Sequence, residues 1–270
     1  MARKKGKKMW KGFLAVLVAI IIVDVAQMIA SDINSTTSIN TNGIERVIVP
    51  EYITNDTYEY TGFTVYFNKD THLPNCTVYE LTRDEANGKL PRDDNFHQDE
   101  NVDGCASLED YRYSGYDRGH MVPAGDMKWN AQAMSDCFSL ANMVPQKQSL
   151  NSGAWNKLEQ KIRNWAIRDS ALIVITGPIV TAADRAITIG DSEVVVPASL
   201  YKIVLAHHAS PMRGIAFIYP NEKAKGGLAK HTVSIDEVEK ATGLDFFSEL
   251  PDDVENEVEA TSDLNQWEYR

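Results

Sequence analysis

The sequence predicts an α+β fold with one domain over residues 52–250, and two patterns indicate this class. Short runs that alternate in polarity or are wholly apolar recur along the chain, as expected of strands. These runs are Phe63–Phe67, Cys76–Leu81, Ala171–Thr176, Val194–Val196, Ser199–Ala206 and Gly214–Tyr219. Segments with helical spacing lie between and after them. The length of 270 residues and the apolar fraction of 43% suffice for one substantial core.

The segment Asn151–Arg168 is the strongest helix candidate, and Asn130–Asp136 is a shorter one. Apolar side chains recur in the longer segment at spacings of three and four residues, which is the pattern of a helix that packs on a core. These side chains are Ala154, Leu158, Ile162, Trp165 and Ala166. By contrast, residues 87–104 are polar and rich in acids, and they predict a surface loop.

A third helix is predicted over Ser234–Thr242 by the residues at its two ends. Ser234 can cap the first turn, and Glu237 stands at the spacing that completes a capping box. Gly243 can end the helix because glycine adopts the left-handed backbone conformation that closes many helices.

The first thirty residues differ in kind from the rest. Lysines and arginines crowd the start, and Phe13–Val23 is an unbroken apolar run. This pattern predicts a signal peptide or signal anchor over residues 1–30. The protein is therefore expected to be secreted or anchored on the extracytoplasmic side, with membrane contact through residues 10–30 if uncleaved. Cleavage after Ala30 would place Met28 where a small residue is preferred, so both outcomes stay open. Residues 31–51 are predicted to be a linker.

The chain has three cysteines, Cys76, Cys105 and Cys137, so one intramolecular disulfide at most can form. An exported chain can carry disulfides. Cys137 lies in a dense apolar segment and is expected to be buried. We therefore predict a bridge between Cys76 and Cys105.

The net charge of −11 argues against a nucleic-acid partner, because proteins that bind nucleic acids are usually basic. The charge is unevenly distributed, however. Residues 236–270 contain twelve acidic and two basic side chains, a net charge of −10, and residues 251–270 are predicted to be a solvated acidic tail. Residues 111–168 contain eight basic and four acidic side chains, a net charge of +4. The residues with candidate chemistry lie in this basic stretch.

The first candidate motif runs from Tyr116 to Ala124 and contains Asp-Arg-Gly-His at its centre. Arg118 and His120 are two residues apart, so on an extended chain their side chains share a face. Imidazole can take a proton from water near pH 7, and guanidinium binds phosphate oxygens. The pair therefore suits phosphodiester chemistry. Taken alone, the Asp-Arg-Gly-His string is better explained as a turn with a surface histidine than as a catalytic motif.

The second candidate segment begins the long predicted helix. Asn151, Trp155, Glu159 and Arg163 follow one another at steps of four and are expected to share a face. Each has an ordinary explanation, since asparagine often caps a helix and a Glu–Arg pair is often solvated. Their combination with the Asp-Arg-Gly-His string favours a functional site.

With these segments the sequence resembles the DNA/RNA non-specific endonuclease family. Asp117–His120 carries the family's signature, and the match continues through Leu140–Lys147 and Leu150–Glu159. Shorter matches follow in the same order at 175–178, 196–202, 216–221 and 242–247, so the resemblance covers roughly residues 52–250. It implies a ββα-metal nuclease fold, with a central antiparallel sheet and flanking helices. In that fold two strands and a helix bring His120 across from Asn151.

The resemblance implies roles for the residues nearest the reaction. His120 is expected to be the general base that activates water. Asn151 is expected to be the sole direct protein ligand of Mg²⁺, which Mn²⁺ can replace, and Glu159 to hold the waters on that ion. This agrees with the preference of Mg²⁺ for few protein ligands and several waters. The products would carry 5′-phosphate ends.

Four further residues are expected to support the substrate or the site by the same resemblance. Arg118 and Arg163 are expected to contact phosphate and the transition state, and Asn142 to support the site nearby. The family also uses an arginine upstream of the signature, for which Arg83 is the candidate. The expected substrates are DNA and RNA, without a preference between them. The chain is further expected to form a homodimer. Inhibition is expected either by a separate inhibitor protein or by the acidic tail.

Other functions are less well supported. A zinc hydrolase needs three or four His, Cys or carboxylate ligands, and the adjacent pair His207 and His208 falls on a predicted strand, where neighbouring side chains point in opposite directions. A serine hydrolase would need a G-x-S-x-G motif, which is absent. The alternative of another class is a catalytically inactive nucleic-acid-binding or surface protein on the same fold, and the presence of His120, Asn151 and Glu159 argues against it.

Overall fold

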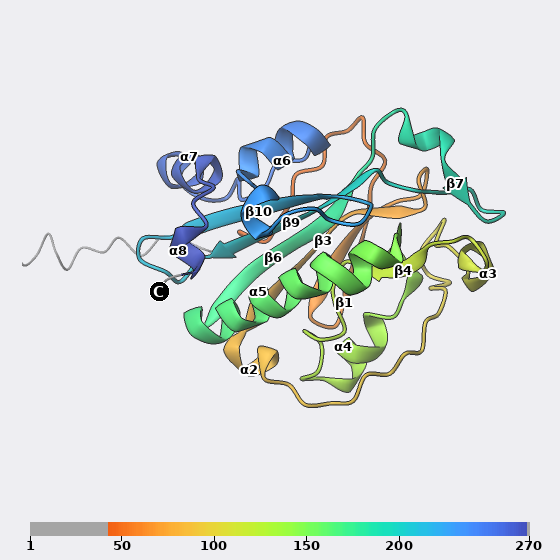
Figure 1. The fold of residues 1–270 in the computed structure, drawn as a ribbon, viewed down its shortest axis with the longest axis horizontal. Coiled ribbons are helices and arrows are strands. Elements are labelled where there is room, and N and C mark those ends of the chain that lie inside the picture. The colour runs from red at the N-terminus through yellow and green to blue at the C-terminus, as the bar shows by residue number, and fades with distance from the viewer. Residues whose placement is uncertain (1–42, 269–270) are drawn as a thin grey trace, which may run out of the picture. The chain divides into compact units, whose positions relative to one another are not determined.

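The computed structural model describes residues 43–268, which are built on a seven-stranded antiparallel sheet (Figure 1). The strand order is β1-β2-β3-β6-β9-β10-β11, and every neighbouring pair is antiparallel. The strands are β1 (Asp56–Tyr60), β2 (Phe63–Asn68), β3 (Leu73–Thr82), β6 (Ala171–Ile179), β9 (Ser199–Ala206), β10 (Arg213–Pro220) and β11 (Thr232–Val233). The predicted α+β class is confirmed, and its apolar runs form the central strands.

Helices cover both faces of this sheet. Alternate side chains of β10 point to opposite faces and so identify the helix that packs on each. Phe217 stacks on Trp165 of α5 (Asn156–Asp169), with ring centroids 6.2 Å apart. Gly214 faces the other way, where an added Cβ would lie 2.7 Å from Ile235 of α6 (Ile235–Thr242) and 2.8 Å from Val258 of α7 (Asp252–Ala260). The sheet is therefore the middle layer, with α5 on one face and α6 with α7 on the other (Figure 1).

The remaining elements are short and mostly lie in the connections. They are α2 (Arg83–Ala86), α3 (Leu108–Tyr111), β4 (Asp117–His120), α4 (Ala131–Asp136), η1 (Leu140–Asn142), β5 (Met143–Gln146), η2 (Leu150–Trp155), η3 (Asp184–Ala186), β7 (Thr188–Ile189), β8 (Val194–Val195), η4 (Leu228–Lys230) and α8 (Asn265–Glu268). The predicted short helix is α4, and the predicted capping box begins α6, which ends at Gly243 with a φ of 75°.

Residues 251–268 are not the solvated tail that their charge predicted. They form α7 and α8, and Trp267 is 1% exposed. Its ring lies 4.9 Å from that of Trp165, and the guanidinium of Arg213 lies 5.0 Å above it. Burying one tryptophan removes a large apolar surface from water, which outweighs the charge of the surrounding residues.

The domain also begins earlier than predicted. Ile44 and Val47 are buried, and Ile48 pairs with Asp245 in an isolated bridge. Residues 43–51 are therefore part of the domain rather than of a linker. The predicted signal segment over residues 1–30 lies outside the described residues. Within residues 43–268, no helix has the length and apolar character needed to cross a membrane.

The predicted disulfide between Cys76 and Cys105 does not form, and all three cysteines are free and buried. The reason is that the two side chains lie on opposite faces of the sheet. Cys76 lies on β3 and its side chain shares a face with Glu80, whereas Cys105 belongs to the core cluster on the opposite face with Tyr79. The burial predicted for Cys137 is confirmed. Burial raises the pKa of all three thiols, which keeps them protonated and unreactive.

Candidate active site

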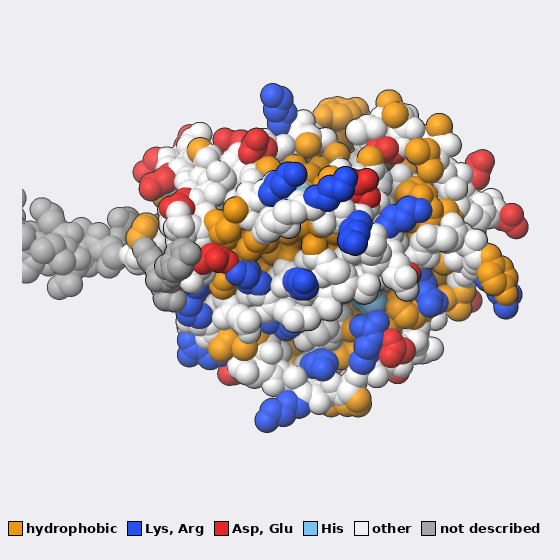
Figure 2. All heavy atoms as spheres, viewed as in Figure 1, with side chains coloured by type: hydrophobic (Ala, Val, Ile, Leu, Met, Phe, Trp, Pro, Cys, Tyr) orange, Lys and Arg blue, Asp and Glu red, His pale blue; other side chains and the backbone are white. Residues whose placement is uncertain are grey.

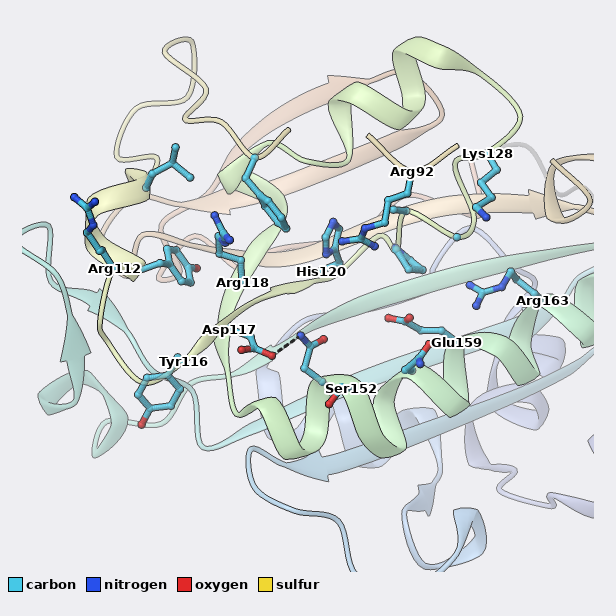
Figure 3. Close-up of a pocket in the computed structure, with 18 of the residues that line it drawn as sticks. Arg92, Arg112, Tyr116, Asp117, Arg118, His120, Lys128, Ser152, Glu159 and Arg163 are labelled. Atoms are coloured by element: carbon cyan, nitrogen blue, oxygen red, sulfur yellow. Dashed lines mark hydrogen bonds between the residues drawn. The ribbon is translucent and has the colours of Figure 1, made fainter. Parts of the chain in front are cut away.

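Two paired strands and a helix frame the main pocket from opposite sides. β4 pairs with β5 in antiparallel register, with His120 opposite Met143, and the chain then passes through η2 into α5. A pocket of about 800 Å³ opens between β4 and α5. Figure 3 shows Arg118 and His120 reaching into it from the strand side, and Glu159 and Arg163 facing them from the helix. This unit brings together the two segments that the sequence singled out.

His120 lies in an aromatic setting at the pocket wall. Its ring meets Phe138 edge-on at a centroid distance of 5.0 Å and Phe96 at 5.4 Å, and the residue is 8% exposed. Nε2 has no hydrogen-bond partner among the described residues. Burial, together with the weaker effect of the Arg92 and Arg118 charges, lowers the pKa of His120 from 6.5 to about 3. The imidazole is therefore neutral at pH 7 and able to accept a proton.

This shift predicts that His120 makes the protein less stable in mild acid. Below pH 6.5 the unfolded chain binds a proton at this residue and the folded chain does not until about pH 3, so the free energy of unfolding falls as pH drops. The loss is at most about 1.4 kcal/mol per pH unit. Urea unfolding at pH 7 and pH 5 should show a smaller acid loss for His120→Gln than for the wild type. An equal loss in both proteins would contradict the burial of a neutral imidazole.

Asn151 is oriented by the first residue of the signature. Its Nδ2 donates a hydrogen bond of 3.0 Å to Oδ2 of Asp117, the contact drawn as a dashed line in Figure 3. The side-chain oxygen Oδ1 accepts no hydrogen bond from a described residue and is the atom left for a ligand in the pocket. Asp117 is thus a positioning residue that the sequence analysis did not assign.

The helix does not begin at Asn151, and the predicted shared face is partly wrong. η2 is a wide turn with a non-helical residue, Gly153, and the regular helix α5 starts at Asn156. The turn rotates Trp155 into the core, where it is 0% exposed, while Asn151, Glu159 and Arg163 remain at the pocket. Glycine has no Cβ and adopts the unusual backbone angles that this kink requires.

Asn142 supports the site without lining the pocket. The residue is fully buried, and its side-chain amide holds the segment that follows β4. Its Oδ1 accepts from the N–H of Val122 at 2.9 Å, and its Nδ2 donates to the carbonyl oxygens of Val122 at 3.0 Å and Cys137 at 2.8 Å. Three satisfied hydrogen bonds fix the course of the chain two residues after the histidine.

A buried charge network lies under the helix side of the pocket. Arg163 donates to Oδ1 of Asp126 at 2.5 Å, and the hydroxyl of Tyr79 donates to Oδ2 of the same carboxylate at 2.6 Å. Burial raises the pKa of Glu159 and lowers that of Lys202, while the charge of each favours ionisation of the other. The net effect raises the pKa of Glu159 to about 7, with the charge of Lys202 limiting the rise.

Lys202 is a second residue that the sequence analysis did not assign. It is 1% exposed, and its Nζ donates to Oγ1 of Thr176 at 2.7 Å and to the carbonyl of Met121 at 3.3 Å. It therefore connects the central strand β9 to the residue next to His120. A charged residue within an otherwise apolar strand run was the sequence signal for it, because a buried lysine requires partners.

Arg83 does not reach the pocket, so its prediction as a substrate-binding residue is wrong. Its guanidinium donates to the carbonyl of Ile167 at 2.6 Å and to Oγ of Ser170 at 2.9 Å, and thereby caps the end of α5. Two arginines upstream of the signature line the pocket, Arg92 and Arg112, and the one whose charge acts on His120 is Arg92, from the polar loop between α2 and α3. It lies 4.9 Å above the ring of Phe138 and beside His120 (Figure 3). A polar loop has no periodicity from which this position could be predicted.

The two arginines predict opposite results on substitution. If the pocket binds phosphate, as the resemblance implies, Arg92→Ala should raise KM for the phosphate-bearing substrate and lower kcat/KM by roughly 10-fold or more, because a charge-assisted phosphate contact contributes about 1.5–3 kcal/mol. Arg83→Ala should leave both constants within twofold and lower the free energy of unfolding by about 1 kcal/mol through the lost helix cap. Steady-state kinetics and urea unfolding of both variants check this. A larger kinetic loss in Arg83→Ala would restore the original assignment.

Charge is separated over the surface of the domain. Figure 2 shows lysine and arginine side chains spread over the face that carries α5, and acidic side chains gathered around α6 and α7. α7 begins with Asp252, Asp253 and Glu255, and no residue of α7 or α8 is among those that line the pocket. The net charge of −11 therefore does not oppose an anionic substrate at the pocket, because the field near the site is set by the local arginines.

Comparison with known proteins decides the family. A model of the DNA/RNA non-specific endonuclease family matches residues 40–253. The chain belongs to this family. A solved chain in a crystal structure of an EndoG/EndoGI complex, which describes the mechanism of EndoG inhibition, superposes with a TM-score of 0.67 at 27% identity. The match covers 72% of this chain and 86% of the other. The predicted ββα-metal fold is thereby confirmed.

Curated relatives agree. The chain is 33% identical to the mitochondrial nuclease EXOG of Mus musculus over 72% of its own length and 58% of the relative's. It is 33% identical to nuclease C1 of Cunninghamella echinulata over 72% of this chain and 84% of that protein. It is 34% identical to the mitochondrial endonuclease G of Bos taurus over 56% and 55%. The chain thus spans somewhat more than half the length of EXOG.

These relatives correct the predicted location. We expected a secreted or extracytoplasmic membrane-anchored protein from residues 1–30. EXOG and endonuclease G are mitochondrial nucleases, and they point to a mitochondrial rather than a secreted location. The predicted location depended on residues 1–30 alone, which lie outside the described residues.

Proposed function

We propose that this endonuclease-family protein hydrolyses phosphodiester bonds of both DNA and RNA, with one divalent metal ion and with His120 as general base. The observation that carries the proposal is the placement of a neutral, buried imidazole across one pocket from Asn151 and Glu159. A base on one side and oxygen ligands on the other are what an in-line attack on phosphorus requires.

His120 would take the proton from the attacking water. Its low pKa means that it is unprotonated at neutral pH and able to accept the proton. The Phe96 and Phe138 rings restrict its orientation and exclude bulk water from one side. Asn142 maintains the backbone after the histidine, so the base is held in place before substrate arrives.

The residues of the pocket suit a hard divalent cation. Asn151 offers the free Oδ1, and Glu159 offers a carboxylate to which no described residue donates a hydrogen bond. Oxygen ligands of this kind are preferred by Mg²⁺ and Mn²⁺, and a single direct protein ligand leaves room for several waters. When bound, the ion would stabilise negative charge on the phosphate and on the leaving oxygen.

Three arginines surround the space where the phosphate would lie. Arg92 and Arg118 approach from the strand side and Arg163 from the helix (Figure 3). Arg118 stacks over Phe96 at 4.0 Å and Arg163 is fixed by Asp126, so their guanidinium groups are oriented in advance. Contacts to phosphate carry no sequence information, which supports cleavage without base or sugar preference.

The alternative of an inactive nucleic-acid-binding protein is less well supported. It would retain the arginines but have no need for a depressed His120 pKa or for the positioning of Asn151 by Asp117. Both features have a cost in folding and a use in catalysis.

Removal of the metal tests the proposal. The full chain should cut supercoiled plasmid and ribosomal RNA with Mg²⁺ or Mn²⁺, lose both activities in excess EDTA, and regain them when Mg²⁺ is restored. Asn151→Ala should abolish both, and Arg83→Ala, which lies outside the pocket, is the matched control. Undiminished cleavage in EDTA would exclude the metal, and binding of nucleic acid without cleavage under every condition would favour the inactive alternative.

A further inference from the structure

A second cluster of metal-ligating side chains lies away from the pocket. Glu80, His207 and His208 place one ligand atom each within 4.8 Å of one another. Nε2 of His207 is 3.0 Å from Oε1 of Glu80, and the two imidazole rings are 4.0 Å apart at an angle of 44°. The expectation that the histidines point in opposite directions is wrong, because β9 ends at Ala206 and both residues lie in the following turn.

Strand register places this cluster on the sheet face opposite the pocket. Glu80 pairs with Ile173, and Ile173 with Leu205, so the three side chains share one face. His207 lies in the turn just beyond the end of β9, and its Nε2 reaches Glu80 on this face. The neighbouring residue Tyr79 points to the other face, where it donates to Asp126 under the catalytic pocket. The two sites are therefore separated by the sheet.

The surroundings of the cluster favour a cation. It lines a cavity of about 460 Å³ that also contains Glu45 and Glu59. Neither lysine nor arginine is among the residues that line this cavity in the described part of the chain. Three carboxylates and two imidazoles thus line one cavity, and no lysine or arginine among its described lining residues offsets the negative charge of the carboxylates.

We propose that Glu80, His207 and His208 bind a divalent transition-metal ion of the zinc type, at a site distinct from the catalytic pocket. Two imidazoles and one carboxylate are a ligand set that Zn²⁺ accepts, and a water or a further ligand completes the coordination. Mg²⁺ disfavours imidazole and would not compete. The ion connects the turn after β9 to β3 and adds stability to the sheet when bound.

The affinity is expected to be modest. Nδ1 of His207 is buried and has no hydrogen-bond partner among the described residues. Histidine ligands usually donate this second N–H to a carboxylate or carbonyl, and loss of such a partner weakens binding by about 10–100-fold. Zinc at micromolar to millimolar concentration is therefore the range to examine.

Isothermal titration of the full chain with Zn²⁺, in excess Mg²⁺ and after prior treatment with a chelator, tests the site. We expect one ion per chain, and a weakening of at least about 10-fold in both His208→Asn and Glu80→Gln. The Glu80 side chain is 49% exposed and His208 is exposed, so these substitutions should not unfold the chain. His97→Asn, at a half-buried histidine outside the cluster, is the matched control and should bind as the wild type does.

Two measurements make the outcome decisive. Co²⁺ in place of Zn²⁺ should give the visible absorption of a site with nitrogen and oxygen ligands, and His208→Asn should lose it. Mg²⁺-dependent nuclease activity should be unchanged in His208→Asn, so failure of this site is distinguishable from failure of the proposed function. Absence of zinc binding up to 1 mM (about the limit of a useful site), or equal binding in wild type, His208→Asn and Glu80→Gln, would overturn the proposal.

Discussion

Replacing His120 with alanine is expected to lower kcat for DNA and RNA cleavage by about 100- to 10,000-fold, the usual contribution of a general base. The reason is that the His120 imidazole lines the pocket and is neutral at pH 7 because burial lowers its pKa. The arginines remain in His120→Ala, so KM should change by less than about threefold if substrate binding depends on phosphate contacts. Single-turnover cleavage of a labelled oligonucleotide separates the chemical step from binding.

His97→Ala is the control for this experiment. Within the described part of the chain its side chain hydrogen-bonds to the carbonyl of Asn95 alone, and it is not among the residues that line the pocket. Its activity should equal that of the wild type. If His120→Ala retained more than a tenth of wild-type kcat, another group would have to act as the base, and the assignment would be withdrawn.

Replacing Asp126 with alanine is expected to lower the free energy of unfolding by about 3 kcal/mol, because removal of one partner leaves the other charge of a buried pair uncompensated. Asp126 is 1% exposed and accepts hydrogen bonds from both Arg163 and Tyr79. The Arg163 side chain keeps 18% exposure, so we take the lower end of the usual range. Cleavage should also slow, because the guanidinium loses its fixed orientation.

An exposed pair provides the comparison for Asp126→Ala. Arg46 and Glu249 lie 3.6 Å apart with side chains 69% and 46% exposed, and Glu249→Ala should change stability by less than about 1 kcal/mol. Urea unfolding of the two variants measures both effects. Equal losses in the two variants would show that Arg163 and Asp126 are not a buried pair in solution.

Local sequence signals predicted the regular elements well. The capping box at Ser234 and the glycine at 243 fixed both ends of α6, and the apolar run 171–176 became the strand β6, which is buried throughout. These features depend on neighbours in sequence. By contrast, the last helices depend on one distant contact, the packing of Trp267 on Trp165. The acidic composition of residues 251–268 predicted a solvated tail, because a prediction from charge alone does not take the burial of one tryptophan into account.

The candidate site was predicted only where the residues fall within recognisable segments. His120 and Asn151 lie in such segments, and the structure places them at one pocket. Arg92 lies in a polar loop and reaches the pocket through tertiary folding alone, which is why Arg83 was chosen instead. Lys202 comes from the far side of the core, and its contact with Met121 requires the sheet to be assembled. The site therefore combines local motifs with charges that only the fold brings together.

Competition between the two substrates tests the central claim most directly. Wild-type protein with Mg²⁺ should cleave labelled DNA and labelled RNA in separate reactions. When the two are mixed, each should inhibit cleavage of the other with an inhibition constant equal to its own KM, because both occupy the pocket between β4 and α5. Cleavage of only one substrate, or cleavage of both without mutual inhibition, would contradict the account of one pocket that recognises the phosphate backbone.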